Sequence, residues 1–223
     1  MEVRIMQTKL RRSLLASLIL FLLFLTLTTA LLTADIRPIG PNGSSVGLAT
    51  LNGPVAQAVG VHLFWYVLTD WLGVAALLAA AGFALLGFIQ LVRRRSLRAV
   101  DPDILALGGV YLLAIAACTF FEVFVVNCRP TLLNGVLEAS YPSSHTILVL
   151  CILGTALLQA RLRLKGRLQT VAQVLCVLAM AMTVMGRFLS GVHWFTDLLG
   201  GVLLGFSLVA LYLAVLRALR LPV

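Results

Sequence analysis

Long apolar stretches, separated by short polar or turn-rich segments, make up most of this 223-residue chain. The hydrocarbon core of a bilayer is about 30 Å thick, so a helix needs roughly 20 apolar residues to cross it. Six stretches approach this length, at residues 13–32, 63–92, 104–126, 147–160, 168–185 and 194–216. The pattern therefore predicts an all-α fold, a polytopic bundle of six transmembrane helices.

The composition agrees with this pattern and excludes a soluble globular domain. Hydrophobic residues make up 61% of the chain and charged residues 11%, and the mean hydropathy is +1.06, far from the usual balance of soluble domains. The chain has no internal repeat, no low-complexity tract and no room for a separate soluble domain. We therefore expect a single transmembrane domain over residues 1–223.

The first apolar stretch also has features of a signal peptide. Basic residues precede it, and small residues occur at Thr29-Ala30 and Thr33-Ala34. However, its apolar run over residues 14–32 is longer than the usual signal-peptide core of about 7–15 residues. We therefore expect a retained helix, whereas cleavage would leave five helices.

The basic residues indicate how the bundle is oriented. They cluster before the first helix and after the second, fourth and sixth: Arg4, Lys9, Arg11, Arg12, Arg93, Arg94, Arg95, Arg98, Arg161, Arg163, Lys165, Arg167, Arg217 and Arg220. These segments fall on one side of the membrane, and the positive-inside rule makes that side cytoplasmic. We therefore expect both termini in the cytoplasm and the intervening loops on the extracytoplasmic face.

This topology also accounts for the net charge of +9. Basic segments at a cytoplasmic surface contact anionic lipid headgroups, so membrane lipids are the expected partners and no nucleic acid is needed to explain the charge. Three basic residues remain on the outer side, where the orientation rule gives no reason for them: Arg37, Arg129 and Arg187.

The segment from Arg187 to Asp197 carries a candidate site for phosphoryl transfer. His193 and Asp197 are four residues apart, and residues at this spacing share one face of a helix. Asp197 can then accept the proton of one imidazole nitrogen and leave the other nitrogen free to attack. Arg187 adds a planar fork of donors that suits phosphate oxygens.

A second polar group lies on the same outer side. Glu122 and Arg129 come at the end of the third apolar stretch, and the loop after them leads to residues 141–145. Pro142 stands where a helix can begin, with Ser143 as its N-cap. Such a helix points free backbone N–H groups outward, which favours binding of an anion.

These segments resemble the motifs of the type 2 phosphatidic acid phosphatase superfamily, the membrane-embedded lipid phosphate phosphatases. The family motifs read K-x-x-x-x-x-x-R-P, P-S-G-H and S-R-x-x-x-x-x-H-x-x-x-D. The matching segments are EVFVVNCRP, PSSH and GRFLSGVHWFTD, in the same order and at the predicted helix ends. The resemblance covers residues 122–201, the motif-bearing core of the chain.

The resemblance implies a metal-independent phosphatase that uses a phosphohistidine intermediate and no cofactor. It implies that His193 is the nucleophile, that Asp197 orients and charges it, and that His145 protonates the leaving oxygen and then assists water. The implied phosphate-binding residues are Arg129, Arg187, Ser143 and the backbone around Ser144. The residue types agree with this chemistry, because phosphoryl transfer depends on positioning and on donors aimed at developing negative charge.

Three positions depart from the family motifs: the lysine of the first is Glu122, the glycine of the second is Ser144, and the serine of the third is Gly186. Glu122 replaces a phosphate-facing cation by an anion. Three consequences are open: weaker phosphate binding, a substrate with an amine, or a contact that orients Arg129 or Arg187. We expect Glu122 to tune substrate choice without abolishing turnover, and Ser144 to be tolerated.

Two further questions are whether the site binds zinc and what the carboxylate of Asp70 does. A zinc site built from His145, His193 and Asp197 is disfavoured, because zinc sites usually have a further close protein ligand and the arginines would repel a cation. Asp70, near the outer end of the second stretch, is a second substrate-tuning candidate. It either pairs with Arg129 or Arg187 or simply reaches the headgroup layer.

Three further features of the sequence have ordinary structural explanations. Residues 37–60 form a turn-rich outer connection that either covers the site as a lid or merely joins two helices. His62, beside aromatic residues, fits an interfacial aromatic belt. The small residues Gly201 and Gly205 favour packing within the bundle over dimerisation, and the sequence predicts no oligomeric state.

A site at helix ends, with no soluble domain, favours an amphiphilic substrate that enters from the bilayer. We therefore expect an integral membrane lipid phosphatase of a bacterial inner or plasma membrane, which hydrolyses a phosphate or diphosphate monoester of a lipid at the outer leaflet. Of the substrates that the resemblance suggests, undecaprenyl diphosphate is the first candidate, before phosphatidylglycerophosphate and phosphatidate. The alternatives are a lipid phosphotransferase with the same site and a catalytically inactive lipid-binding membrane protein.

Overall fold

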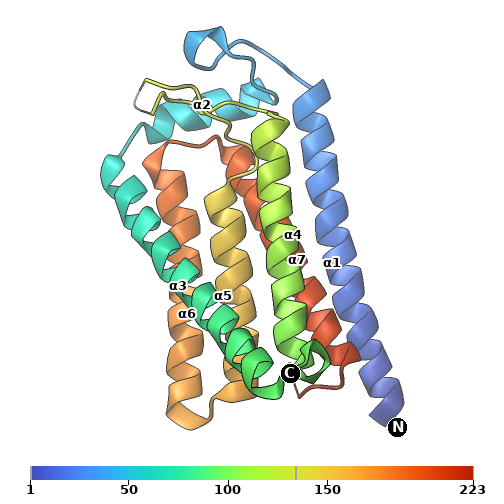
Figure 1. Cartoon of the computed structure of the whole chain (residues 1–223). Helices are drawn as coiled ribbons and strands as arrows, with labels where there is room; N and C mark the ends of the chain where they lie inside the picture. The colour runs from blue at the N-terminus through green and yellow to red at the C-terminus, as the bar shows by residue number, and fades with distance from the viewer. Residues whose placement is uncertain (1, 134, 223) are drawn as a thin grey trace.

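The computed structural model describes residues 2–133 and 135–222, and its regular secondary structure is helical (Figure 1). Its α-helices are α1 (Glu2–Thr33), α2 (Ala49–Val59), α3 (Leu63–Arg94), α4 (Pro102–Val123), α5 (Ser144–Arg163), α6 (Gly166–Ser190) and α7 (Phe195–Ala218). Two short 3-10 turns are η1 (Pro41–Gly43) and η2 (Leu97–Ala99), and the described residues form isolated bridges but no strand. Six helices, all except α2, are long and apolar enough to cross a membrane, which confirms the predicted spans.

Several observed helices extend beyond the predicted apolar stretches, and α5 does so at both ends. The prediction for α5 covered residues 147–160, whereas the helix begins at Ser144 and ends at Arg163. The hydroxyl of Ser143 accepts a hydrogen bond from the backbone N–H of Thr146 at 3.4 Å, so Ser143 is the predicted N-cap. Apolarity marks only the part of a helix inside the hydrocarbon, and polar residues at its ends continue the same helix.

The most buried helix of the bundle is α5, which contacts α3, α4, α6 and α7. Glycines of α7 allow its close approach. A Cβ atom on Gly201 would lie 2.8 Å from Cβ of Thr146, and one on Gly205 would lie 3.0 Å from Cβ of Leu150. This arrangement confirms that the two small residues serve packing within the bundle.

Polar contacts join α1 to α7 along the membrane-spanning part of the bundle. The hydroxyl of Ser17 donates to the carbonyl of Ser207 at 2.9 Å, and the hydroxyl of Ser207 donates to the carbonyl of Ser17 at 3.0 Å. Near the ends of the chain, Arg217 donates to the carbonyl of Lys9 at 2.8 Å. These contacts hold α1 against α7 within the bundle.

The outer connection forms a short helix, α2, which lies across the end of the bundle opposite both termini (Figure 1). Buried Asn52 attaches it to the first turn of α7. The side-chain amide of Asn52 donates to the hydroxyl of Thr196 at 3.0 Å, and the backbone N–H of Thr196 donates to the amide oxygen of Asn52 at 3.3 Å. We call this end of the molecule the site end, because the candidate residues meet there.

At the opposite end, near both termini, four polar residues, three of them buried, form a network that the sequence patterns did not indicate. This terminal-end network consists of Asp103, Gln159, Arg163 and Tyr212. The Asp103 carboxylate accepts hydrogen bonds from Gln159 at 2.9 Å and from Arg163, and the Tyr212 hydroxyl donates to the Asp103 carbonyl at 3.1 Å. Each polar group of the network therefore has a partner.

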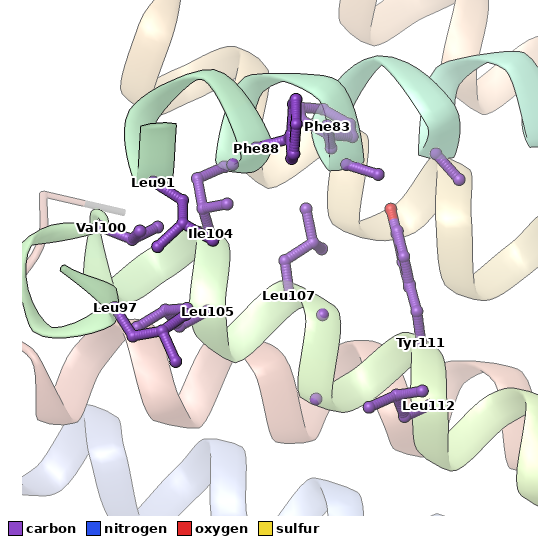
Figure 2. A pocket seen from close by; sticks show the side chains of 15 residues that line it. Phe83, Phe88, Leu91, Leu97, Val100, Ile104, Leu105, Leu107, Tyr111 and Leu112 are labelled. Atoms are coloured by element: carbon purple, nitrogen blue, oxygen red, sulfur yellow. The ribbon is translucent and has the colours of Figure 1, made fainter. Parts of the chain in front are cut away.

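An apolar crevice of about 550 Å³ opens between α3 and α4 in the half of the bundle near the terminal-end network (Figure 2). Phe83, Phe88 and Leu91 of α3 face Ile104 and Leu107 of α4 across it. Among the described residues, those that line the crevice are all uncharged. Its apolar lining therefore suits apolar groups. The charged candidate residues of the molecule lie elsewhere, at the site end.

Candidate active site

The ends of α4, α5, α6 and α7 bring the motif residues together at the site end. His193 occupies the connection between α6, which ends at Ser190, and α7, which begins at Phe195. The prediction that His193 and Asp197 share a helical face was therefore wrong in detail. Gly191 ends α6 in the left-handed conformation with φ of 67°, and a Cβ atom there would collide with the Gly60 carbonyl. The chain turns at this glycine and returns His193 toward Asp197.

A serine lies between His193 and Asp197. The His193 Nδ1 atom is 3.7 Å from the Asp197 Oδ2 atom, longer than a hydrogen bond. The Ser140 hydroxyl is 3.1 Å from the same Nδ1 atom and donates to Asp197 Oδ2. The expected direct hydrogen bond is therefore replaced by a chain from imidazole to hydroxyl to carboxylate.

Asp197 is held by backbone as well as by Ser140. Its Oδ2 atom accepts a hydrogen bond from the backbone N–H of Trp194 at 2.8 Å, at the start of α7. The side chain is fully buried, and its Oδ1 atom has no hydrogen-bond partner among the described residues. A buried carboxylate with a free oxygen is costly for stability, which is typical of a functional group.

The other imidazole nitrogen of His193 faces an arginine. The His193 Nε2 atom is 3.3 Å from an NH1 atom of Arg129. The Arg129 Nε atom lies 3.0 Å from a carboxylate oxygen of Glu138, a loop residue that the sequence analysis did not single out. Arg129 therefore stands beside the nitrogen that would attack a phosphate, with its charge already paired.

Burial lowers the pKa of His193 from its usual value near 6.5, and the positive charges of Arg129 and Arg187 lower it further. The Asp197 carboxylate opposes this shift. The imidazole is therefore kept neutral at pH values where a free histidine would begin to take up a proton. A neutral imidazole has the lone pair that a nucleophile needs.

A second cluster joins α3, α5 and α6. Arg187 is 2% exposed and forms an ion pair with Asp70, which confirms one of the two expected pairings of that carboxylate. The guanidinium carbon of Arg187 lies 4.9 Å from the centre of the Tyr66 ring. The His145 Nε2 atom lies 3.6 Å from Asp70 and has no hydrogen-bond partner among the described residues. Histidine, arginine and carboxylate thus meet in one place.

Gly73 of α3 makes room for His145. A Cβ atom on Gly73 would run into the imidazole of His145 and would lie 3.0 Å from its Cε1 atom. Below the imidazole, a groove of about 240 Å³ runs between α3 and α5, with Asp70 and His145 among mostly apolar lining residues. The groove therefore leads from the apolar surface of the bundle to the polar cluster.

The N-terminus of α5 lies beside these groups. The Ser143 backbone N–H donates to the Asp197 carbonyl at 3.0 Å, and the Ser143 hydroxyl accepts from the Thr146 hydroxyl at 3.0 Å. Ser144 lines the same narrow cavity as His193 and Arg129. Ser143 therefore holds the helix start in place, and contact of either serine with phosphate stays a prediction.

Glu122, at the end of α4, also lines the cavity that contains His193 and Arg129. One of its three expected roles was to orient Arg129 or Arg187. In the described chain, Arg129 pairs with Glu138 and Arg187 pairs with Asp70, whereas no lysine, arginine or histidine nitrogen lies within 4.0 Å of Glu122. Glu122 therefore faces the cavity as an uncompensated carboxylate.

The glycine at position 186 has a packing reason. A Cβ atom on Gly186 would lie 2.5 Å from the Thr69 methyl group and 3.4 Å from the Trp65 ring. The close approach of α3 to α6 therefore leaves no room for the serine of the family motif. The same approach brings Asp70 of α3 to Arg187 of α6.

Sequence reasoning missed Glu138 and Ser140, which lie in the loop before α5. Their signal was available, because they are polar residues directly before the segment 141–145. The loop folds back so that the Ser140 backbone N–H donates to the Asn127 carbonyl at 2.9 Å and the Arg129 N–H donates to the Glu138 carbonyl at 3.0 Å. His62 stays outside the site, with its ring nitrogen 2.9 Å from the Val59 carbonyl.

Comparisons with known proteins agree with this arrangement. The profile of the PAP2 superfamily matches residues 103–220, more than half of the chain. A similar solved structure is the crystal structure of the first transmembrane PAP2 type phosphatidylglycerolphosphate phosphatase from Bacillus subtilis. It has a TM-score of 0.57 and 19% sequence identity, over 88% of this chain and 93% of that chain. No curated protein matches significantly by sequence.

At 19% identity this structural likeness shows a shared fold. The six apolar helices make the chain a multi-pass membrane protein, as expected. Family membership rests on the profile match over residues 103–220, which includes Glu122, Arg129, His145, His193 and Asp197. This membership supports a phosphatase activity. The chain belongs to the PAP2 superfamily.

Proposed function

We propose that this protein is an integral membrane lipid phosphatase that works through a phosphohistidine intermediate. The observation that carries the proposal is the environment of His193. Its Nδ1 atom faces the Ser140 hydroxyl at 3.1 Å and its Nε2 atom faces Arg129 at 3.3 Å. With the proton on Nδ1 directed to Ser140, the lone pair of Nε2 points to the arginine side, where a phosphate would bind.

The reaction has two balanced steps. In the first, His193 Nε2 attacks phosphorus, a P–N bond forms, the P–O bond to the lipid breaks, and His145 gives a proton to the leaving oxygen. In the second, water attacks phosphorus, His145 takes the proton of water, and the P–N bond breaks to release phosphate. Asp197 stabilises the positive charge on the imidazole through Ser140.

The proposed orientation follows from the positions of the basic residues. The termini and the basic segments lie at the end of the bundle opposite the site (Figure 1). Since basic segments favour the cytoplasmic side, both termini are cytoplasmic and the site faces the outer leaflet. The groove between α3 and α5 supports a substrate whose apolar tail stays in the bundle surface while its phosphate reaches His145.

The test is phosphate release by the purified protein in detergent with EDTA present. Undecaprenyl diphosphate, the substrate predicted from the sequence, is compared with phosphatidylglycerophosphate and phosphatidate. We expect release that His193→Ala reduces by at least about 10³-fold. The control His62→Ala removes an exposed histidine of the same end and should keep full activity.

Equal activity of His193→Ala and the parent protein would contradict the proposed nucleophile. Product analysis decides the acceptor: inorganic phosphate indicates hydrolysis, whereas a newly phosphorylated lipid indicates the phosphotransferase alternative. Absence of any release from folded protein, with all three lipids, would favour the inactive lipid-binding alternative.

A further inference from the structure

The charges around His193 do not match a simple phosphate dianion. Two guanidinium groups, of Arg129 and Arg187, face four carboxylates: Asp70, Glu122, Glu138 and Asp197. With His193 neutral and His145 protonated, as the first step of the proposed reaction requires, three positive and four negative charges give the site a net charge of −1. A phosphate dianion would raise the negative charge further, at a cost that grows as water is excluded.

Three of these carboxylates already have a partner that fixes them. Glu138 pairs with Arg129, Asp70 pairs with Arg187, and Asp197 accepts hydrogen bonds from Ser140 and the backbone of Trp194. The fourth, Glu122, has no cationic partner within 4.0 Å in the described chain. Among these four carboxylates, Glu122 is therefore the one that no cation or hydrogen-bond donor of the described site is shown to fix.

Glu122 is also placed where a substrate can reach it. It lines one narrow cavity with Arg129, Ser144 and His193, whose imidazole is nine-tenths buried. The side chain stands at the outer end of α4 and is exposed. A group attached next to a phosphate on His193 would therefore meet the Glu122 carboxylate.

We infer that the site takes a lipid phosphate that carries an ammonium group close to the phosphate, and that Glu122 binds this ammonium. The inference rests on the proposed phosphatase function. An ammonium supplies the missing positive charge and donates hydrogen bonds to the carboxylate. The reaction itself is unchanged: the P–O bond to the lipid breaks, and the products are inorganic phosphate and the amino lipid alcohol.

The substrate inferred here differs from undecaprenyl diphosphate. That diphosphate carries several negative charges and no cation. Electrostatic complementarity contributes to specificity chiefly by disfavouring the wrong partner. Glu122 therefore selects against strongly anionic headgroups and for zwitterionic ones.

The test uses three synthetic lipids of equal chain length: hexadecyl phosphate, 2-aminohexadecyl phosphate and its N-acetyl derivative. The acetyl compound keeps the bulk of the amine and removes its charge. With EDTA present, we expect kcat/KM for the amine to exceed that of both others by at least about 10-fold, the range of a charge-assisted hydrogen bond. Glu122→Gln should abolish this preference, and Glu122→Lys should reverse it toward hexadecyl phosphate.

The control Asp35→Asn changes a carboxylate at the same end that binds the Thr50 backbone N–H and Arg37, and it should keep the preference. Equal kcat/KM for all three lipids in an active parent protein would overturn the inference and leave the proposed function standing. Loss of turnover on every lipid would instead count against the proposed function.

A divalent cation bound to phosphate could supply the same positive charge. The assays are therefore repeated with Mg²⁺ in place of EDTA. If Mg²⁺ raises turnover of hexadecyl phosphate to that of the amine, and Glu122→Gln removes the gain, the subsite binds a metal–phosphate complex and the ammonium inference is wrong. No effect of Mg²⁺, together with an amine preference that depends on Glu122, supports the ammonium.

Discussion

The two ends of this bundle both contain buried polar groups, but these groups differ in whether they have hydrogen-bond partners. In the terminal-end network, the Asp103 carboxylate is satisfied by Gln159 and Arg163. At the site end, Asp197 Oδ1 and His145 Nε2 are buried without hydrogen-bond partners among the described residues. Satisfied polar networks stabilise and specify a fold, whereas unsatisfied ones cost stability and are kept for function. The polar groups of the terminal-end network therefore fit a role in stabilising the fold, whereas the unpartnered groups at the site end fit a role in chemistry.

The strongest test of this difference is Asp197→Asn. The amide keeps an oxygen that can accept the Trp194 N–H, so the start of α7 stays capped. It loses the charge that, in the proposed reaction, stabilises the imidazole during phosphoryl transfer. We expect kcat to fall by about 10³–10⁴-fold with little change in the melting temperature. A loss below about 10-fold, or a large drop in melting temperature, would mean that Asp197 is mainly structural.

The converse change is Asp103→Ala in the terminal-end network. It removes the carboxylate that accepts hydrogen bonds from the Arg163 guanidinium and the Gln159 amide. We expect the free energy of unfolding to fall by about 2–4 kcal/mol, measured by thermal unfolding in detergent, while kcat/KM changes less than about threefold. Asp103→Asn, which keeps an acceptor oxygen, is the milder control. A loss of activity with unchanged stability would contradict the view that the terminal-end network serves the fold and not the reaction.

A smaller effect is expected from Ser140→Ala. The hydroxyl joins His193 Nδ1 to Asp197 Oδ2, which are 3.7 Å apart. Without it the imidazole loses its fixed orientation, and we expect kcat to fall about 10–100-fold with KM nearly constant. Ser140→Thr retains a hydroxyl and should recover part of the activity. If Ala and Thr behave alike, the hydroxyl does not position His193.

The smallest effect concerns pH. Because burial holds the pKa of His193 below 6.5, the acid limb of kcat/KM should have its midpoint below pH 6.5. The unfolded chain takes up a proton near 6.5 that the folded site resists, so His193 also makes the fold less stable as pH falls below 6.5. We expect His193→Gln to lose less thermal stability than the parent between pH 7.5 and 5.5. An acid limb above pH 7 would mean that burial does not control this imidazole.

The sequence predicted the six spans and the residues of the candidate site. It could do so because the length of an apolar stretch and the spacing of a motif are local properties of the chain. It placed Ser143 correctly as an N-cap and allowed the Asp70–Arg187 pair, found in the structure. It missed Ser140, because its place between His193 and Asp197 depends on how the loop before α5 folds against residues more than 50 positions later in the chain. It also missed Asp103 and Gln159, which are 56 residues apart in the chain. Contacts of that kind arise only from tertiary packing.

The attachment of α2 has a practical consequence for anyone who alters the outer loop. Asn52 is bonded to Thr196, the neighbour of Asp197 in the first turn of α7, and the backbone N–H of Gly47 donates to Asn127 at 3.1 Å in the loop below. By contrast, the turn Pro41–Gly43 has no buried residue. An epitope tag or fluorescent probe can therefore be inserted at residues 41–43, whereas a deletion between Gly47 and Asn52 would disturb the start of α7 beside the candidate active site.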